Sequence, residues 1–325
     1  MKAIRVHQFG GPDVLRLEGV PDPTPGPGEV LVRLHAAGVN PADTYVRAGA
    51  YALKPSLPYT PGTEGAGVID ALGPDVIDLA VGQRVWLSAA TAGRMQGFYA
   101  ERCAAAARHV HALPDTLSFE QGAAINIAFV TAYRALFDRG QVKPGEIVLI
   151  HGATGGVGLA AVQIAARHGA IVLGTGGTVE GRQLAERHGA AKTFDHRQPA
   201  YRDAITAATG GHGVDVVIEM LANVNLDKDL GLLAHGGRVV VVGNRGRVEI
   251  DARQTMAKES TVTGVTYWGG GDAAVMAALA AVEAGVNAGT YVPFVGQAFP
   301  LEQAARAHEA VMAGDGARGK IVLTM

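Results

Sequence analysis

The hydrophobic positions of roughly the first 120 residues form short runs that are separated by proline and glycine. Apolar runs lie at 30–34, 67–69 and 84–87, and one connection carries a proline at every second position, at Pro21, Pro23, Pro25 and Pro27. Several short strands at this spacing are typical of a barrel-like or partly open β domain. We therefore expect this part of the chain to be β-rich.

The pattern changes near Asn126, beyond which helical stretches alternate with aliphatic runs at 147–150, 171–173, 214–218 and 239–242. This alternation indicates βαβ units and predicts a doubly wound parallel sheet over residues 125–262. The tail has one long helical stretch and a final apolar strand at 320–323, which is too little for a domain of its own. The predicted fold class is α/β, with the parallel sheet inserted into a β-rich domain of residues 1–124 and 263–325.

A glycine-rich turn follows the apolar run at 147–150. Aligned on Gly158, the pattern is Ala153-x-Gly155-x-x-Gly158, so alanine replaces the first glycine of the usual G-x-G-x-x-G. Gly152 suits the tight turn, Gly155 allows the backbone to approach a pyrophosphate, and Gly158 allows the next helix to pack closely. The strand, turn and helix together predict a dinucleotide site, and the alternative is a glycine-rich turn without a cofactor.

The end of the next predicted strand bears on the choice of dinucleotide. NAD-binding domains of this kind carry an acidic residue there, about 20 residues beyond the glycines. Here residues 173–177 contain no acid, and Arg182, Lys192 and His196 follow nearby. A carboxylate would repel a 2′-phosphate, so its absence favours NADPH. The alternative is that the three basic residues are ordinary surface residues.

The composition argues against several kinds of partner and of metal site. The 325 residues suit two domains, and a net charge of −2 shows no general excess of Lys and Arg for nucleic acid or anionic lipid. One cysteine, Cys103, excludes a disulfide framework and every zinc site that needs cysteine. His109 and His111 lack a third ligand at metal spacing, so we expect a structural role and no metal. With no signal peptide or membrane span visible at Met1–Val6, we expect a cytoplasmic protein.

An unusual polar cluster lies in the first domain, at 38–51 and 58–64. Asn40 and Tyr45 offer hydrogen bonds and Tyr51 offers a flat apolar face, so these residues are candidates to line a pocket for a planar carbonyl compound. The alternative is a turn asparagine with half-buried tyrosines.

With these motifs in place, the sequence resembles the zeta-crystallin-type quinone oxidoreductases of the medium-chain dehydrogenase/reductase superfamily over its whole length. The resemblance implies a GroES-like catalytic domain split around a Rossmann domain, NADPH as cofactor, quinones as acceptors, no zinc, and a homodimer or homotetramer. Its most telling stretches are 38–45, 58–62, 151–158, 218–226 and 255–260.

The resemblance also assigns cofactor contacts residue by residue. Asn244 and Tyr267 differ in type from the family pattern, in which serine and leucine are common. Zinc-dependent relatives carry Gly-His-Glu where this chain has Gly62-Thr63-Glu64, and a cysteine ligand where it has Asn40. The implied cofactor contacts are Tyr45, Thr154, Gly155, Gly156, Val157, Gly177, His196, Asn225, Val242, Gly243, Asn244, Arg245, Val265, Thr266 and Tyr267.

We therefore expect an NADPH-dependent, zinc-free reductase that transfers hydride to a quinone in the interdomain cleft. The first alternative is an alkenal or enone reductase, in which Tyr45 would protonate the enolate. The second is RNA binding or a structural, crystallin-like role, which the lack of a basic segment interleaved with aromatic residues disfavours.

Overall fold

The computed structural model describes residues 1–52, 54–88, 97–314, 316 and 318–325 in two compact units. Unit 1 comprises 1–127, 283–315 and 319–325, and unit 2 comprises 128–282 and 316–318. The structure thus confirms that a parallel α/β domain is inserted in the sequence of a β-rich one. None of the helices in the described part of the chain combines the length and apolar character that a membrane span needs.

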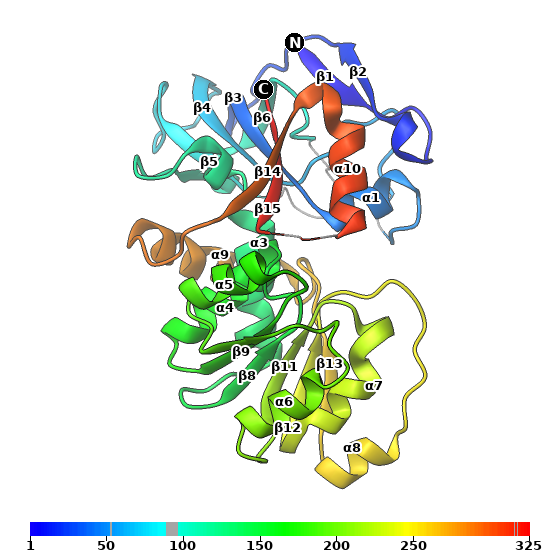
Figure 1. The fold of residues 1–325 in the computed structure, drawn as a ribbon. Coiled ribbons are helices and arrows are strands. Elements are labelled where there is room, and N and C mark those ends of the chain that lie inside the picture. Colours follow the sequence, from blue (N-terminus) through cyan, green and yellow to red (C-terminus); the bar gives the residue numbers. More distant parts are fainter. Residues whose placement is uncertain (53, 89–96, 315, 317) are drawn as a thin grey trace. The chain divides into compact units, whose positions relative to one another are not determined.

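Unit 1 is built around β3 (Glu29–Val39), whose two edges pair with different strands (Figure 1). One edge pairs with β4 (Gly65–Leu72), and the other pairs with β6 (Arg102–Ala106) near its start and with β15 (Lys320–Thr324) near its end. The strand order is β14-β15-β3-β4-β5-β7, with β6 off this path on β3. The C-terminal strand therefore completes the β-rich unit, as expected.

Alternation along β3 turns Val30, Val32 and Leu34 into the core, where each is at most 2% exposed. The remaining elements of this unit are β1 (Lys2–Arg5), η1 (Pro12–Val14), β2 (Arg16–Gly19), α1 (Pro41–Arg47), β5 (Arg84–Leu87), η2 (Ala107–His109), β7 (Val110–Ala112), α2 (Phe119–Gly122), β14 (Val295–Pro300), η4 (Leu301–Gln303) and α10 (Ala304–Ala313).

Unit 2 contains a parallel sheet in the order β10-β9-β8-β11-β12-β13. The chain moves outward from β8 (Ile147–Ile150) through β9 (Ile171–Thr175) to β10 (Lys192–Phe194), and then returns to place β11 (Val214–Glu219) beside β8. The strand order therefore reverses between β8 and β11, which is where doubly wound sheets bind ligands.

The other strands of unit 2 are β12 (Leu233–Val241) and β13 (Thr261–Gly264). Its helices are α4 (Gly156–Arg167), α5 (Val179–Arg187), α6 (Tyr201–Ala208), α7 (Ala222–Leu232), α8 (Arg253–Lys258) and the π-helical segment η3 (Arg134–Arg139), while α3 (Asn126–Tyr133) and α9 (Gly271–Asn287) extend across the unit boundaries.

The predicted range of the inserted domain, 125–262, differs from that of unit 2, mainly at its C-terminal end. Unit 2 runs to 282 rather than to 262, and its start lies at 128 rather than 125. The physical reason is that β13 pairs in parallel with β12, and that Arg134 binds the carbonyl oxygens of Thr266 and Tyr267. The chain returns to the β-rich unit within α9, at Glu283.

Candidate active site

The glycine turn joins β8 to α4, and Gly152 and Gly158 have the turn and packing roles that the sequence predicts. Gly152 has a φ of +59°, which a residue with a side chain adopts only under strain. A Cβ atom at Gly158 would lie 2.1 Å from the carbonyl oxygen of Gly152, so only glycine permits this helix to pack so closely. At Gly155 the nearest atom to such a Cβ is the carbonyl oxygen of Gly152 at 3.6 Å, so a Cβ there would make only an ordinary contact with the protein.

The cofactor contacts implied in unit 2 gather at one edge of the parallel sheet. Each follows the carboxyl end of a strand: Thr154 after β8, Gly177 after β9, His196 after β10, Asn225 after β11, and further segments after β12 and β13. Because carboxyl ends of parallel strands share one edge, the topology brings these residues together around the glycine turn. The further segments are Val242–Arg245 and Val265–Tyr267.

Two buried contacts support these last segments. A Cβ at Gly243 would lie 2.2 Å from the carbonyl oxygen of Met220, so the loop after β12 packs directly on the backbone after β11. Arg134, which is 1% exposed, donates from Nη1 to the carbonyl oxygens of Thr266 (2.6 Å) and Tyr267 (2.7 Å). The sequence analysis missed Arg134, although an arginine within the apolar stretch 127–137 was a usable signal.

The basic residues near Gly177 have different partners. Arg182 donates to the carbonyl oxygen of Gly176 (3.0 Å) and pairs with Asp195 (3.2 Å), so it supports the loop. His196 and Arg197 instead lie 3.5 and 3.6 Å from the position that a Cβ of Gly177 would take. The sequence analysis missed Arg197, whose side chain is 62% exposed and pairs with Asp195 at 3.3 Å. His196 and Arg197 are therefore the side chains nearest to a Cβ at Gly177.

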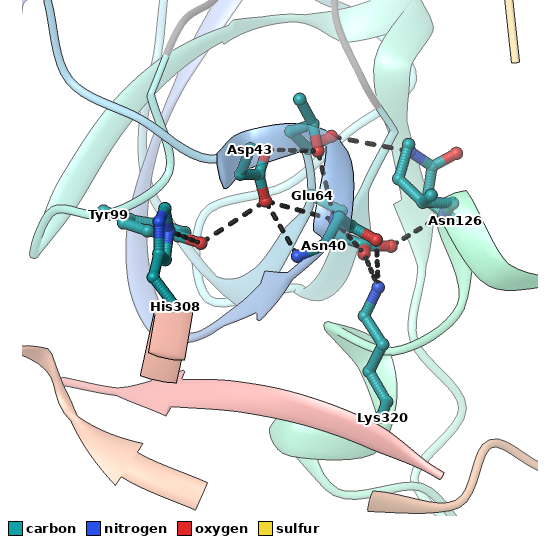
Figure 2. A network of polar contacts seen from close by, with 9 residues as sticks. Asn40, Asp43, Glu64, Tyr99, Asn126, His308 and Lys320 are labelled. Atoms are coloured by element: carbon teal, nitrogen blue, oxygen red, sulfur yellow. Dashed lines mark hydrogen bonds and ion pairs between the residues drawn. The ribbon is translucent and has the colours of Figure 1, made fainter. Parts of the chain in front are cut away.

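Unit 1 contains a buried polar network that begins at Asn40 (Figure 2). Asn40 caps the start of α1, and its Nδ2 donates to Glu64 Oε1 (2.9 Å) and Thr63 Oγ1 (3.3 Å). The ammonium group of Lys320, on β15, binds both Asn40 Oδ1 and Glu64 Oε1. Glu64 Oε2 accepts from the backbone N–H of Ile127 (2.8 Å). Because its polar atoms are engaged within the protein, Asn40 fits the structural role better than substrate contact.

The same network continues from Asp43 to Arg47. Arg47 Nη1 donates to His308 Nδ1 (3.2 Å), so the proton of His308 lies on Nε2 and is donated to the hydroxyl oxygen of Tyr99 (3.1 Å). The Tyr99 hydroxyl then donates to Asp43 Oδ2 (3.3 Å). Burial, reinforced by the charge of Arg47, lowers the pKa of His308 to about 3, which keeps the ring neutral. None of Asp43, Tyr99 and His308 was singled out from the sequence.

Tyr45 and Tyr51, the two candidate tyrosines, are both half-buried. This agrees with the alternative interpretation of the sequence, in which they are simply half-buried tyrosines. Tyr45 lies on α1, and Tyr51 packs against a small apolar cluster of Val6, Val14, Val46 and Tyr59. Burial raises the pKa of Tyr51, so its hydroxyl is a poorer acid than usual. Tyr45 thus remains the candidate proton donor, and its role stays a prediction.

His109 and His111 have structural partners. Both rings lie within hydrogen-bond distance of Ser88 Oγ, at 3.3 and 3.2 Å, and His111 also stacks on Trp86 and contacts Glu283 Oε2 (3.2 Å). A third possible ligand, Glu283, does therefore lie near His111, although it is distant in sequence. Its hydrogen bond to His111 lowers the pKa of Glu283. The expected structural role agrees with these contacts.

Lys320→Met tests the ion pair inside unit 1. The substitution keeps most of the side-chain volume but leaves the Glu64 carboxylate, which is 0% exposed, without its cation. We expect the free energy of unfolding, measured by urea denaturation, to fall by about 3–5 kcal/mol. Adding Glu64→Gln should recover part of the loss because no unpaired charge remains. Wild-type stability of the single variant would contradict this account.

Asp43→Asn tests the protonation of the same network. Burial raises the pKa of Asp43 to about 6, from a usual 3.8, so the folded protein holds this proton more tightly than the unfolded chain. The stabilisation is fully present below about pH 4 and is lost as the pH rises through about 6. The stability difference between wild type and variant should therefore fall by up to about 3 kcal/mol over this range. A difference independent of pH in urea titrations would refute the shift.

Comparisons with known proteins agree with this architecture. The family model described as alcohol dehydrogenase GroES-like domain matches residues 26–115, and the one described as zinc-binding dehydrogenase matches 156–283. Quinone oxidoreductase of Homo sapiens is 49% identical over 326 aligned residues, which cover 100% of this chain and 98% of that protein. The protein of the same name from Rattus norvegicus is 46% identical, with the same coverage.

Solved structures give the same result. The Escherichia coli quinone oxidoreductase in complex with NADPH is 31% identical and has a TM-score of 0.87, with 100% of both chains covered. An NAD-dependent alcohol dehydrogenase, also 31% identical and fully covered, has a TM-score of 0.92. On these grounds the chain belongs to the quinone oxidoreductase family of the medium-chain dehydrogenase/reductase superfamily.

Proposed function

We propose that this protein reduces quinones with NADPH by hydride transfer and without zinc. The observation that carries the proposal is the convergence of the implied cofactor contacts on one edge of the unit 2 sheet, around the glycine turn between β8 and α4. The full-length similarity to a human quinone oxidoreductase supports the choice of acceptor. When bound, NADPH supplies the hydride, and the quinone takes up this hydride and a proton from solvent to become a hydroquinone.

The proposal that the enzyme works without zinc rests on the charge inside unit 1. Asn40 and Thr63 stand where zinc-dependent relatives have ligands, and neither is a good zinc ligand. The ammonium group of Lys320 lies directly between Asn40 and Glu64 and supplies the positive charge that balances the buried carboxylate. A divalent cation there would have to displace this ammonium. We therefore expect quinone reduction to persist after exhaustive dialysis against a chelator.

The preference for NADPH is proposed from the surroundings of Gly177. This position carries no acidic side chain, and His196 and Arg197 flank it. Arg197 is exposed and cationic, which suits a phosphate monoester better than a ribose hydroxyl. The solved structure described as an NAD-dependent alcohol dehydrogenase makes NADH the alternative to be tested.

Gly177→Asp restores the missing carboxylate, and Gly177→Asn is its neutral, matched control. A Cβ at this position makes only ordinary contacts, because the nearest atoms to it are 3.5 Å away. We expect Asp to weaken NADPH binding at least tenfold relative to Asn through repulsion of the 2′-phosphate, and to leave NADH binding nearly unchanged. Fluorescence titration of both cofactors measures this. Equal effects of Asp and Asn, or tighter binding of NADH than of NADPH by the wild type, would overturn the preference.

Tyr45→Phe separates the quinone from the enone reaction. A quinone needs no protein acid, because its reduced anion is stable enough to be protonated by solvent, so loss of a positioning hydrogen bond should cost at most about tenfold in kcat/KM. An enone that depended on Tyr45 as general acid should lose about 10²–10⁴-fold. The assay uses one quinone and one enone with NADPH, before and after chelation. A loss above about a hundredfold with the quinone would contradict the proposal.

The interdomain cleft, the homodimer or homotetramer and the cytoplasmic location stay predictions from the sequence. RNA binding as the main role has little support, since the chain carries 28 Lys and Arg against 30 Asp and Glu.

A further inference from the structure

Three ionisable side chains meet inside unit 2, directly beneath the glycine turn. His151 follows β8, Glu219 ends β11 and Asp229 lies on α7, and all three are buried, with exposures of 3%, 0% and 0%. Their polar atoms lie within 4.8 Å of one another. We refer to these three residues as the carboxyl–histidine cluster. The sequence analysis gave no role to any of them.

His151 connects the cluster to the glycine turn. Its Nε2 lies 2.9 Å from Asp229 Oδ1 and 3.8 Å from Glu219 Oε2, and its Nδ1 lies 3.1 Å from Thr175 Oγ1. Thr175 Oγ1 also accepts from the backbone N–H of Gly152 (3.3 Å). Hydrogen bonding to the Asp229 carboxylate, together with the charge of that group, outweighs burial and raises the pKa of His151. The Asp229 carboxylate therefore favours the protonated form of the His151 ring.

A second negative charge in this cluster has no such balance. Glu219 Oε2 and Asp229 Oδ2 are both buried, and neither has a hydrogen-bond donor among the described residues. One proton held between the two carboxyl groups would supply the missing donor and remove the second charge. Burial, with the charge and the hydrogen bond of Asp229 acting in the same direction and the charge of His151 opposing them, raises the pKa of Glu219 to about 7. This raised pKa favours a proton on Glu219.

The other oxygen of Glu219 binds the start of α7. Glu219 Oε1 accepts from the backbone N–H of Leu221 and from Asn225 Nδ2 (3.2 Å). Asn225 is one of the implied cofactor contacts, on the first turns of α7. A protonated Glu219 can thus donate to Asp229 with one oxygen and hold Asn225 with the other.

We propose that Glu219 is a positioning residue for NADPH, because its protonated carboxyl group ties the Asn225 amide to the carboxyl–histidine cluster beneath the glycine turn. The inference rests on the proposed function, which makes Asn225 a cofactor contact. Other ionisable groups that act on the cluster are Lys228 on α7, Tyr201 on α6 and His196 after β10.

The test compares Glu219→Gln with Glu219→Leu. Glutamine presents an oxygen to Asn225 and an N–H to Asp229, so it copies the protonated acid, whereas leucine does neither. We expect the Kd for NADPH, measured by fluorescence titration, to stay within about threefold of wild type for Gln and to rise about tenfold or more for Leu. Far-ultraviolet circular dichroism and urea denaturation check that each variant is folded.

Two further measurements distinguish positioning from a general structural role. Asn225→Ala should weaken NADPH binding by itself, and combining it with Glu219→Leu should add little, because both remove the same contact. The wild-type Kd should also rise as the pH is raised through about 7, where Glu219 loses its proton, and Glu219→Gln should remove this dependence. If the leucine variant does not fold, this pH comparison decides.

The other possible results of the Glu219 and Asn225 variants lead to different conclusions. If Gln weakens binding as much as Leu, a carboxylate is required and the proposal is wrong. Stoichiometric divalent metal in the wild type that is lost in Glu219→Gln would likewise overturn it, in favour of a metal site. If Asn225→Ala weakens binding but the Glu219 variants do not, only this inference fails. If Asn225→Ala has no effect, the cofactor contact assumed in the proposed function fails first.

Discussion

The ion pair between Lys320 and Glu64 is the interaction on which the β-rich unit depends. Glu64 is completely buried beside the first residue of β4, and its carboxylate would be costly there without a cation. The cation arrives on β15, the last strand of the chain, which pairs with the end of β3. Strand pairing and charge balance therefore support each other, and the same ammonium fixes Asn40 at the start of α1.

Unit 2 meets a similar constraint with different groups. At the carboxyl ends of β8 and β11, His151 and Glu219 are buried with Asp229, and the His151 ring lies within hydrogen-bond distance of the Asp229 carboxylate. Arg134 satisfies two carbonyl oxygens of the segment after β13. These buried polar groups lie behind residues implied in cofactor binding. These buried contacts hold the carboxyl edge of the parallel sheet in place, which favours precise placement of a dinucleotide.

Membership of a family and the residues of the site bear differently on the chemistry of this protein. One matching family model is described as a zinc-binding dehydrogenase, whereas in unit 1 of this chain a lysine ammonium lies between Asn40 and Glu64. Fold similarity alone cannot decide between chemistries, because related sites on one fold support different reactions. The argument for zinc-free hydride transfer to a quinone therefore depends on particular residues.

The sequence by itself determined the order of elements, the parallel sheet and the glycine turn, because these depend on local periodicity and on backbone conformations that only glycine adopts easily. It also marked the position of Gly177. It could not place the end of unit 2, since Arg134 holds the segment after β13 through its bond to Thr266, 132 residues away in the chain. Only the tertiary structure brought Lys320 to Glu64, 256 residues apart, and His308 to Tyr99, 209 residues apart. Such pairs leave no local pattern, because each side chain is ordinary in its own segment and becomes a buried, balanced group only when the strands pair.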